Sequence, residues 1–561
     1  MALTAPKPSA LASHIHPAPA SFITRYVFTL DHKIIGLQYL ITGTLFFFIS
    51  GALAELIRVQ LMNADGGFLS PDHFSELYSI HGSSMVWLVI IPLATGGFGN
   101  FVMPLMIGAR DVAYPWLNML SFWLFPVAGL ILFSSFLVGA PDAGWTEYPP
   151  VSLQGPPGTS LWCVAIFMIG ISSTLTGINF LATMIKMRAP GMTFTRMPLF
   201  VWAQLATAVL NMVATTALAA ALLALFLERQ FGIPFYDPSK GGSPLLWQHM
   251  FWFYSHPAVY IMILPAFGIV SEVLPTFARK PAFGYKMIAF SSVAIALLGF
   301  MVWAHHMFTS GMIPWLVLPF MILTFIIAIP TGIKIFSWLA TVWGGNIRLS
   351  SSMLFSLGFI CTFTLGGITG IFLAAVPADY QEHGTYFVVA HIHYVLFGGS
   401  VFGLLSGIYY WFPKMTGRLM NEFWGKVHFW LTFVAFNVTF LPMHWLGLLG
   451  MPRRVPVYDP QFTDWNRVAS IGSFFLAFSM LIFLVNLVWS VKHGKRVGPN
   501  PWRARTLEWM TSSPPPYYNF AKIPGVLGLP YDFDKPLPYV GLVPPEQVGS
   551  GYTAPLPAGT H

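Results

Sequence analysis

Long apolar stretches, each of about 20 residues or more, recur along the chain and are separated by short polar segments. A helix that rises about 1.5 Å per residue needs about 20 apolar residues to cross the hydrocarbon core of a membrane. The pattern therefore predicts an all-α integral membrane protein with twelve transmembrane helices. Their expected limits are 33–62, 76–108, 116–140, 159–187, 198–228, 247–277, 285–310, 314–344, 350–376, 384–412, 422–447 and 466–495.

Composition and charge agree with a membrane protein. The chain is 55% hydrophobic and 9% charged, whereas a soluble protein contains about 25% charged residues. The net charge of +8 does not indicate a nucleic-acid surface, because the basic residues form no run and lie between apolar spans. Between residues 25 and 497, the segments on one side of the predicted membrane contribute 16 Lys and Arg, and those on the other contribute 6. The positive-inside rule then places both termini in the cytoplasm, so odd-numbered spans run outward.

The ends of the chain differ from its middle. Both ends are rich in proline, and the N-terminal stretch lacks the apolar core of a signal peptide. The two cysteines, Cys163 and Cys361, lie in apolar segments and offer no disulfide framework. We expect a cytoplasmic N-terminal segment (1–25), a twelve-helix membrane domain that carries the chemistry (26–497) and a Pro-rich cytoplasmic C-terminal tail (498–561).

Six histidines inside apolar spans share one predicted depth. Four lie early in inward-running spans and two lie near the end of an outward-running span, so all six occupy the outer third of the membrane. A lone intramembrane histidine is more often a packing residue, but a cluster of costly ionisable groups indicates function. The six are His81, His256, His305, His306, His391 and His393.

Imidazole is a good ligand of iron and copper, and the spacing of these histidines suggests how they divide. His391 and His393 are two positions apart, so at about 100° per residue they point to nearly opposite sides of one helix and serve two different metals. His81 can pair with His393 as the two axial ligands of one iron. His391 then holds a second iron.

The remaining three histidines predict a copper site. His305 and His306 are adjacent, which suits a metal only if a third ligand comes from another helix, and His256 is the natural candidate. Three imidazoles with an open position fit a copper ion that meets a ligand. The open face of the iron on His391 would then be directed toward this copper.

The residues resemble subunit I of the haem–copper oxygen reductases, from about residue 25 to the SSPPPYYNF stretch near residue 512. The resemblance implies a twelve-helix bundle that holds a low-spin haem, a high-spin haem and one copper ion. It also implies the catalytic subunit of a terminal respiratory oxidase that reduces O2 to water, with proton uptake and pumping. The matching segments are GGFGNFVMPLMIGARD (96–111), WFYSHPAVYI (252–261), WAHHMFT (303–309), IPTGIKIFSWLAT (329–341) and FVVAHIHYV (387–395).

The resemblance assigns roles to the histidines and to one tyrosine. His81 and His393 match the low-spin haem ligands, and His391 matches the proximal ligand of the oxygen-binding haem. Tyr260 matches a catalytic tyrosine that is covalently joined to a copper-ligand histidine, His256 here, and gives an electron and a proton to oxygen. The positions that match the copper ligands are His256, His305 and His306.

Charged residues in the outward-facing loops also match family positions. Arg453 and Arg454 resemble the pair that bridges haem propionates by charge-assisted hydrogen bonds. Arg58 matches an arginine beside the edge of the low-spin haem. His383 matches one ligand of a Mg²⁺ site, with Asp379 nearby, but Gly384 replaces a neighbouring aspartate, so this metal site is incomplete.

Two proton routes are expected from the cytoplasmic side. Lys334, with Thr331 one turn away, marks the first, and Ser271 and Glu272 would form its mouth. The second would begin at Asp111. The polar residues that match its lining are Asn100, Asn118, Ser172, Ser173 and Asn179.

The second route departs from many relatives at its end. Those relatives have a glutamate two residues after the histidine of the sixth span, and this chain has Ala258. It carries Tyr254 and Ser255 where they have an aromatic residue and glycine, which resembles a type A subclass with a YS pair. Tyr254 lies four positions before Ala258 and shares its helix face. We expect Tyr254, with Ser255, to relay protons in place of the glutamate.

The chain contains no motif for a dinuclear copper site, so electrons should arrive through a subunit II that carries one. Quinol-oxidising relatives carry an arginine and an aspartate on the lipid side of the first helix, where this chain shows Phe46 and Ser50. This favours cytochrome c over quinol as donor. Subunit III, haem of the a type and a prokaryotic cytoplasmic membrane are also expected. A nitric-oxide reductase is disfavoured by Tyr260 and Lys334, and a transporter would not need the histidines.

Overall fold

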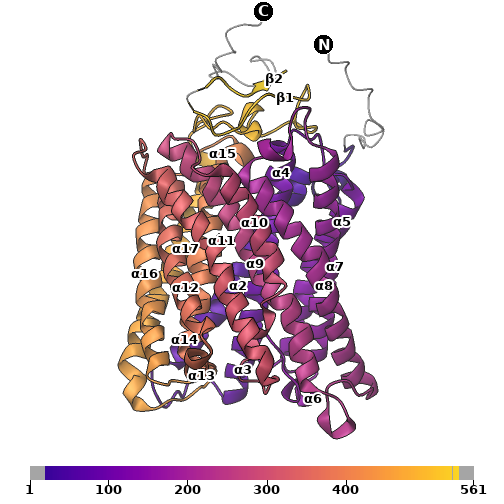
Figure 1. Ribbon diagram of the computed structural model, residues 1–561, viewed down its shortest axis with the longest axis vertical. Helices are drawn as coiled ribbons and strands as arrows, with labels where there is room; N and C mark the ends of the chain where they lie inside the picture. Colours follow the sequence, from indigo (N-terminus) through magenta and orange to yellow (C-terminus); the bar gives the residue numbers. More distant parts are fainter. Residues whose placement is uncertain (1–18, 534, 542–561) are drawn as a thin grey trace, which may run out of the picture.

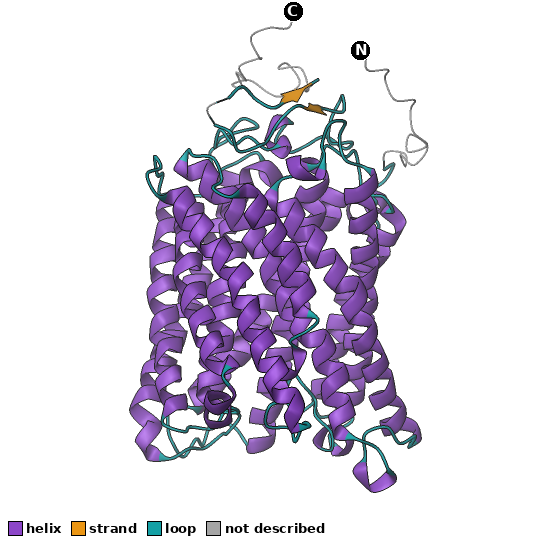
Figure 2. Ribbon diagram, in the orientation of Figure 1, coloured by secondary structure: helices purple, strands orange, loops and turns teal. Residues whose placement is uncertain are grey.

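The computed structural model describes residues 19–533 and 535–541, which form one bundle of long helices (Figures 1 and 2). Within these residues, eleven helical segments are long and apolar enough to cross a membrane, and α10 is a shorter apolar helix. Residues 1–18 of the expected N-terminal segment and 542–561 of the expected tail lie outside the described residues. The eleven spanning segments, together with the shorter α10, are α2 (His32–Gln60), α3 to α4 (Pro71–Met106), α5 (Pro115–Ser134), α7 (Gly158–Lys186), α8 (Leu199–Phe231), α9 (Pro244–Ala278), α10 (Tyr285–Gly299), α11 (Pro314–Val342), α12 (Ser351–Ala374), α14 to α15 (Tyr386–Thr416), α16 (Glu422–Leu448) and α17 (Thr463–His493).

Short elements lie between the spans, before the first span and after the last one. The strands β1 and β2 pair antiparallel at one end of the bundle, whereas α6 and α13 lie at the other end (Figure 1). The short elements are α1 (Phe22–Tyr26), η4 (Ser135–Leu137), α6 (Val151–Gln154), η5 (Phe194–Arg196), η6 (Pro238–Lys240), η7 (Trp303–Met307), α13 (Val376–Glu382), η9 (Pro460–Phe462), η10 (Leu507–Met510), β1 (Gly525–Val526) and β2 (Tyr539–Val540).

Capping residues fix where several spans begin and end. Ser70 precedes Pro71 and accepts a hydrogen bond from the backbone of His73, and Ser243 caps α9 in the same way. A proline at the first helical position needs no hydrogen-bond partner for its nitrogen. At the other end of α8, Gly232 adopts φ 69°, a left-handed conformation that glycine adopts without steric cost.

Two spans contain wider π-helical turns. The second span runs as α3 (Pro71–Ser84), η2 (Met85–Ile90), η3 (Pro92–Gly99) and α4 (Asn100–Met106). The tenth runs as α14 (Tyr386–Val395), η8 (Leu396–Val401) and α15 (Phe402–Thr416). Such turns occur at functional sites more often than elsewhere. Here both follow a helix that carries candidate ligands, His81 on α3 and His391 and His393 on α14.

The seventh predicted span, 285–310, is wrong in its second half. Helix α10 ends at Gly299, a poor helix former, and the chain turns through the 3₁₀ segment η7. His305 and His306 therefore lie on a tight turn beside α9 and not on a continuous helix.

The C-terminal segment packs against the end of the bundle where β1 and β2 lie (Figure 1). Little of it is helical, yet Leu507 and Trp509 are fully buried. The Lys414 ammonium group donates to the carbonyl of Thr511 at 2.7 Å, which ties the segment to α15. The segment thus covers the ends of the helices that it crosses.

Candidate metal centre and cofactor cavity

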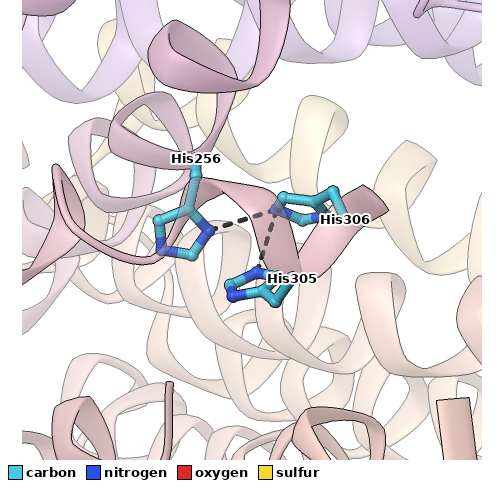
Figure 3. A group of neighbouring side chains, drawn as sticks. All are labelled: His256, His305 and His306. Atoms are coloured by element: carbon cyan, nitrogen blue, oxygen red, sulfur yellow. Dashed lines mark hydrogen bonds between the residues drawn. The ribbon is translucent and has the colours of Figure 1, made fainter. Parts of the chain in front are cut away.

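Three imidazoles converge on one point. His256 comes from α9, and His305 and His306 come from η7 (Figure 3). Nδ1 of His256 and Nε2 of His305 each lie 3.1 Å from Nε2 of His306. One ring nitrogen from each residue lies within 4.8 Å of the others, and the described residues contain no other such group of three His, Cys, Asp or Glu. Three neutral nitrogen donors around one point fit a copper ion.

Neighbouring side chains fix the orientation of these rings. Nδ1 of His305 lies 3.0 Å from the hydroxyl of Thr324 on α11, which leaves Nε2 directed at the triad. The ring of His306 stacks on Trp252 with centroids 3.8 Å apart. The ring of Tyr260 lies 4.8 Å from that of His256, so the predicted pair is adjacent. Neighbouring side chains that contact a ligand in this way hold it in the orientation that a metal requires.

A mostly apolar cavity of about 740 Å³ lies beside helices α2, α3 and α14. His81 and His393 both line it. Nδ1 of His81 lies 2.9 Å from the carbonyl of Ser50, and Nδ1 of His393 lies 2.7 Å from that of Val389. Each ring therefore keeps Nε2 for another partner. Two such imidazoles in an apolar cavity of this size fit an iron-centred macrocycle.

His391 lies apart from this cavity, although it is only two residues from His393. It is not among the residues that line the cavity. Its Nδ1 lies 3.0 Å from the hydroxyl of Thr369 and 3.1 Å from the carbonyl of Gly366, both on α12. The structure thus separates the two histidines of α14 as the helical period requires.

Arginines form the polar part of the cavity wall. Arg58, Arg453 and Arg454 all line it. Arg58 is held by Ser470 and Asn466 of α17, with Nη2 at 2.9 Å from the Ser470 hydroxyl and 2.7 Å from the Asn466 carbonyl. Burial, and next the charge of Arg454, lower the pKa of Arg453 to about 10. Each cation would be stabilised by an anionic group in the cavity.

The family described as "Cytochrome C and Quinol oxidase polypeptide I" matches residues 34–475. The chain belongs to this family. Membership makes it a multi-pass membrane oxidoreductase of the respiratory chain and implies haem and copper as cofactors.

Curated relatives agree over most of their length. A protein of Thermostichus vulcanus named cytochrome c oxidase subunit 1 is 54% identical over 92% of this chain and 94% of its own. The protein of the same name from Bacillus subtilis is 48% identical over 94% of this chain and 86% of its own. A solved heme-copper terminal oxidase dimer superposes with a TM-score of 0.70 at 19% identity, covering 83% of this chain and 85% of that chain. This last similarity supports the fold alone.

Of the two residues predicted to mark the first proton route, Lys334 is buried and Thr331 is partly exposed. The ammonium group of Lys334 donates to the Ser292 hydroxyl at 2.7 Å and to the Ile288 carbonyl at 2.9 Å, both on α10. Thr331 lies one turn away and donates to its own helix. Ser292 was not predicted, although a polar residue facing Lys334 from the neighbouring span was to be expected.

The predicted mouth of this route is covered. Ser271 accepts a hydrogen bond from Trp338 at 2.9 Å. Glu272 accepts one from the hydroxyl of Tyr531 at 2.5 Å and one from the amide of Phe200 at 3.0 Å. Both predicted residues are buried, and Tyr531 of the C-terminal segment contacts Glu272 directly. No short-range pattern could have placed Tyr531 against a residue of α9.

Residues predicted for the second route lie on α4, α5 and α7 and in the loop after α4, and of these Asp111 and Ser173 are partly exposed. The Ser172 hydroxyl donates to the backbone carbonyl of Ser121 at 2.6 Å, and the Tyr39 hydroxyl donates to the side-chain hydroxyl of Ser121 at 3.3 Å. Neither Tyr39 nor Ser121 was predicted; both are polar positions on the faces of neighbouring spans. The buried predicted members are Asn100, Asn118, Ser172 and Asn179.

The YS pair is buried in α9. The Tyr254 hydroxyl accepts a hydrogen bond from the indole of Trp87 at 3.1 Å, and the Ser255 hydroxyl has no partner among the described residues.

The two residues predicted for a Mg²⁺ site lie together at the end of α13. Nδ1 of His383, the residue after the helix, lies 3.1 Å from the carboxylate of Asp379.

Two parts of the sequence interpretation need correction. Histidines inside the spans are not limited to six, because His249, His428 and His444 also lie in spanning helices. Their position within a span does not distinguish these three histidines from the six candidate ligands. The structure does, because none of the three belongs to the triad. Phe46 and Ser50 do not face lipid: Phe46 packs on Phe125 and Ser50 is fully buried. Their identity therefore carries no argument about a lipid-borne donor.

Proposed function

We propose that the chain is the catalytic subunit of a terminal oxidase that reduces O2 to water with electrons from cytochrome c and pumps protons. The observation that carries this proposal is the convergence of His256, His305 and His306 near a cavity lined by His81 and His393. Residues 26–497 form the catalytic membrane domain in this proposal.

Each histidine has a proposed ligand role. The triad would hold copper, His81 and His393 would hold the low-spin haem, and His391 would hold the high-spin haem. When bound, these groups carry electrons and bind oxygen. The guanidinium groups of Arg58, Arg453 and Arg454 would hold the haem edge and its propionates. We propose haem of the a type, and His383 with Asp379 forms at most an incomplete Mg²⁺ site.

Tyr260 is the proposed proton donor at the reacting site. Its ring lies 4.8 Å from that of His256, one helical turn away on the same face of α9. Lys334, with Thr331, would deliver protons toward it from Ser271 and Glu272. The support for this route is that Lys334 is buried and hydrogen-bonded to Ser292 in an otherwise apolar region.

The second route would start at Asp111 and end at the YS pair, which assigns the chain to the corresponding subclass. It would pass the buried amides and hydroxyls of Asn100, Asn118, Asn179 and Ser172, with Ser173. Tyr254 already accepts a hydrogen bond from Trp87. Its hydroxyl proton is therefore available to another acceptor. A Tyr254→Phe variant should lose most proton pumping, and retention of pumping would contradict the relay.

The proposed partners and placement follow from the family. A dinuclear-copper subunit II would deliver electrons from cytochrome c, the donor named in the two curated relatives. Subunit III would complete the complex. The charge distribution supports both termini in the cytoplasm of a prokaryote and the bundle in its cytoplasmic membrane. A quinol donor is the alternative, because the family includes quinol oxidases.

The test is to purify the complex and record reduced-minus-oxidised and CO-difference spectra, with metal analysis of the same sample. We expect two haems, of which one binds CO, and one copper. The band positions will identify the haem type. Absence of a CO-reactive haem, or non-haem iron in place of copper, would contradict oxygen reduction and favour a nitric-oxide reductase.

A further inference from the structure

A buried carboxyl group outside the proposed routes lies in the loop that joins α5 to α7. Glu147 is fully buried, and neither of its carboxyl oxygens has a hydrogen-bond partner among the described residues. A buried ionised carboxylate without such partners is costly, so the group favours its protonated form. Burial, and next the charge of Asp142, raise the pKa of Glu147 to about 8.

The loop holds this side chain inward. Glu147 adopts φ 41°, which is unfavourable for a residue with a side chain, and its amide donates to the carbonyl of Gly144 at 3.1 Å. The residues on either side are fixed to α9: Trp247 donates to the carbonyl of Thr146 at 3.0 Å, and Trp252 donates to the Tyr148 hydroxyl. The surrounding structure therefore maintains the strained turn.

The same loop touches the cofactor cavity through Arg454. This arginine lines the cavity, and its guanidinium donates to the carbonyl of Ala143 at 3.2 Å. A Cβ atom at Gly144 would lie 2.5 Å from the Arg454 guanidinium carbon, so glycine is needed for this contact. A charge that changes in the cavity thus acts on Glu147 across one arginine and one turn of the backbone.

Asp142 of the same loop interacts electrostatically with Glu147 and is partly exposed. Asp142 Oδ1 and the hydroxyl of Thr159 are both buried without partners among the described residues. A Cβ atom at Gly155 would lie 3.3 Å and 3.1 Å from them, so the two oxygens flank the same small residue. Buried groups of this kind are ordinarily bridged by water, which conducts protons.

The charged and titratable groups around Glu147 come from four elements. Asp142 of its own loop raises the proton affinity of Glu147, whereas Arg229 of α8 and Arg454 of the last outer loop lower it. Cys163 of α7 also interacts with it. Arg229 is held by the loop itself, donating to the carbonyl groups of Ser152, Gly155 and Pro156.

We propose that Glu147 is a proton-binding residue on the outer side of the bundle, whose protonation follows the redox state of the haems. An electron added to the cavity makes it more negative, so Glu147 takes up one proton; when the electron leaves, Glu147 releases that proton toward Asp142 and the outer solution. No bond other than O–H changes. This inference rests on the proposed haem sites and deepens the proposed proton pumping.

The experiment is redox-difference infrared spectroscopy on the complete holoenzyme between pH 6 and pH 10, a range of about two units on either side of the pKa. We expect a carboxylic-acid C=O signal that grows on reduction and titrates near pH 8. Glu147→Gln should abolish it, because the amide cannot ionise. Glu76→Gln should leave it unchanged; Glu76 is a carboxyl group of α3 that contacts the same loop by accepting a hydrogen bond from Ala140.

Asp142→Asn supplies a second, independent readout. Removing the neighbouring negative charge should lower the pKa of Glu147, so the midpoint of the C=O signal should move to lower pH. Persistence of the signal in Glu147→Gln, or an unshifted midpoint in Asp142→Asn, would overturn the proposal. If Glu147→Gln does not assemble with its haems, the midpoint in Asp142→Asn decides.

Proton release is measured separately on reconstituted vesicles. Glu147→Gln should release fewer protons outward per electron than Glu76→Gln. If the parent enzyme releases none, the pumping part of the proposed function fails, whereas the infrared signal, which requires only reducible haems, still decides the role of Glu147.

Discussion

The histidine triad and the pair of histidines in the cavity differ in the space between their rings. In the triad, ring nitrogens of His256, His305 and His306 lie within 4.8 Å of one another. His81 and His393 instead line a cavity of about 740 Å³. A single ion needs donors that already converge, whereas a macrocycle needs ligands that stay apart with apolar surface between them.

The triad and the two histidines of α14 nevertheless hold their rings by the same local means. A threonine hydroxyl lies 3.0 Å from Nδ1 of His305 and of His391, supplied by Thr324 and Thr369 respectively. An aromatic ring stacks on one imidazole of each group, Trp252 on His306 and Phe440 on His393. The difference between the groups is therefore set by backbone positions, and it can be tested with matched substitutions.

Removal of one ligand from each group should have the largest effect. His256→Ala should lose copper and keep both haems, whereas His81→Ala should lose the low-spin haem and keep copper. Each variant should lower oxygen reduction by more than about 1,000-fold, equivalent to about 4 kcal/mol in the barrier. Metal analysis and haem spectra of the purified variants measure this directly. Loss of the low-spin haem in His256→Ala would show that the two groups are not independent.

Removal of the threonine hydroxyl groups beside these histidines should have an intermediate effect. Thr324→Val removes the hydroxyl beside His305 and should weaken copper binding about 10- to 100-fold, as loss of a hydrogen-bond partner of a metal ligand usually does. Thr369→Val should leave copper unchanged and alter CO binding at the haem held by His391. Titration with a copper chelator and CO recombination distinguish the two variants.

Thr364→Val is the control for both threonine variants. Thr364 lies on the same helix as Thr369, but its hydroxyl donates to the carbonyl of Ile360 at 2.5 Å. Its loss should affect neither copper nor CO. Equal responses of Thr324→Val and Thr369→Val in copper affinity would contradict a separate role for each threonine.

Much of this comparison was predictable from the sequence. Span direction and the helical period place His391 and His393 on different sides of one helix and bring His256 to the level of His305 and His306. These are consequences of regular geometry, which sequence spacing encodes. The family resemblance added roles that spacing alone does not supply, such as that of Tyr260.

Features that depend on irregular or distant contacts were not predictable. The end of α10 before His305 places this residue on a tight turn, where an apolar sequence predicted a continuous helix. Tyr531 meets Glu272 across 259 residues of sequence. Glu147 stands in an ordinary polar loop sequence, and its burial follows from contacts of neighbouring residues with α9. Hydrophobic pattern carries no information on such contacts.

Removal of the aromatic rings that stack on the histidines should have the smallest effect. It is therefore the most sensitive test of whether the triad and the cavity are independent. Aromatic stacking contributes about 0.5–1.5 kcal/mol beyond burial, so loss of a ring should change ligand affinity about two- to tenfold. Trp252→Leu should weaken copper binding by this amount and spare the low-spin haem. Phe440→Leu should do the reverse, shifting the low-spin haem spectrum. Phe363→Leu removes a buried ring that stacks on Phe359, and it controls for lost packing. If Trp252→Leu shifts the haem spectrum as strongly as Phe440→Leu does, the triad and the cavity respond as one unit, and backbone position alone does not separate them.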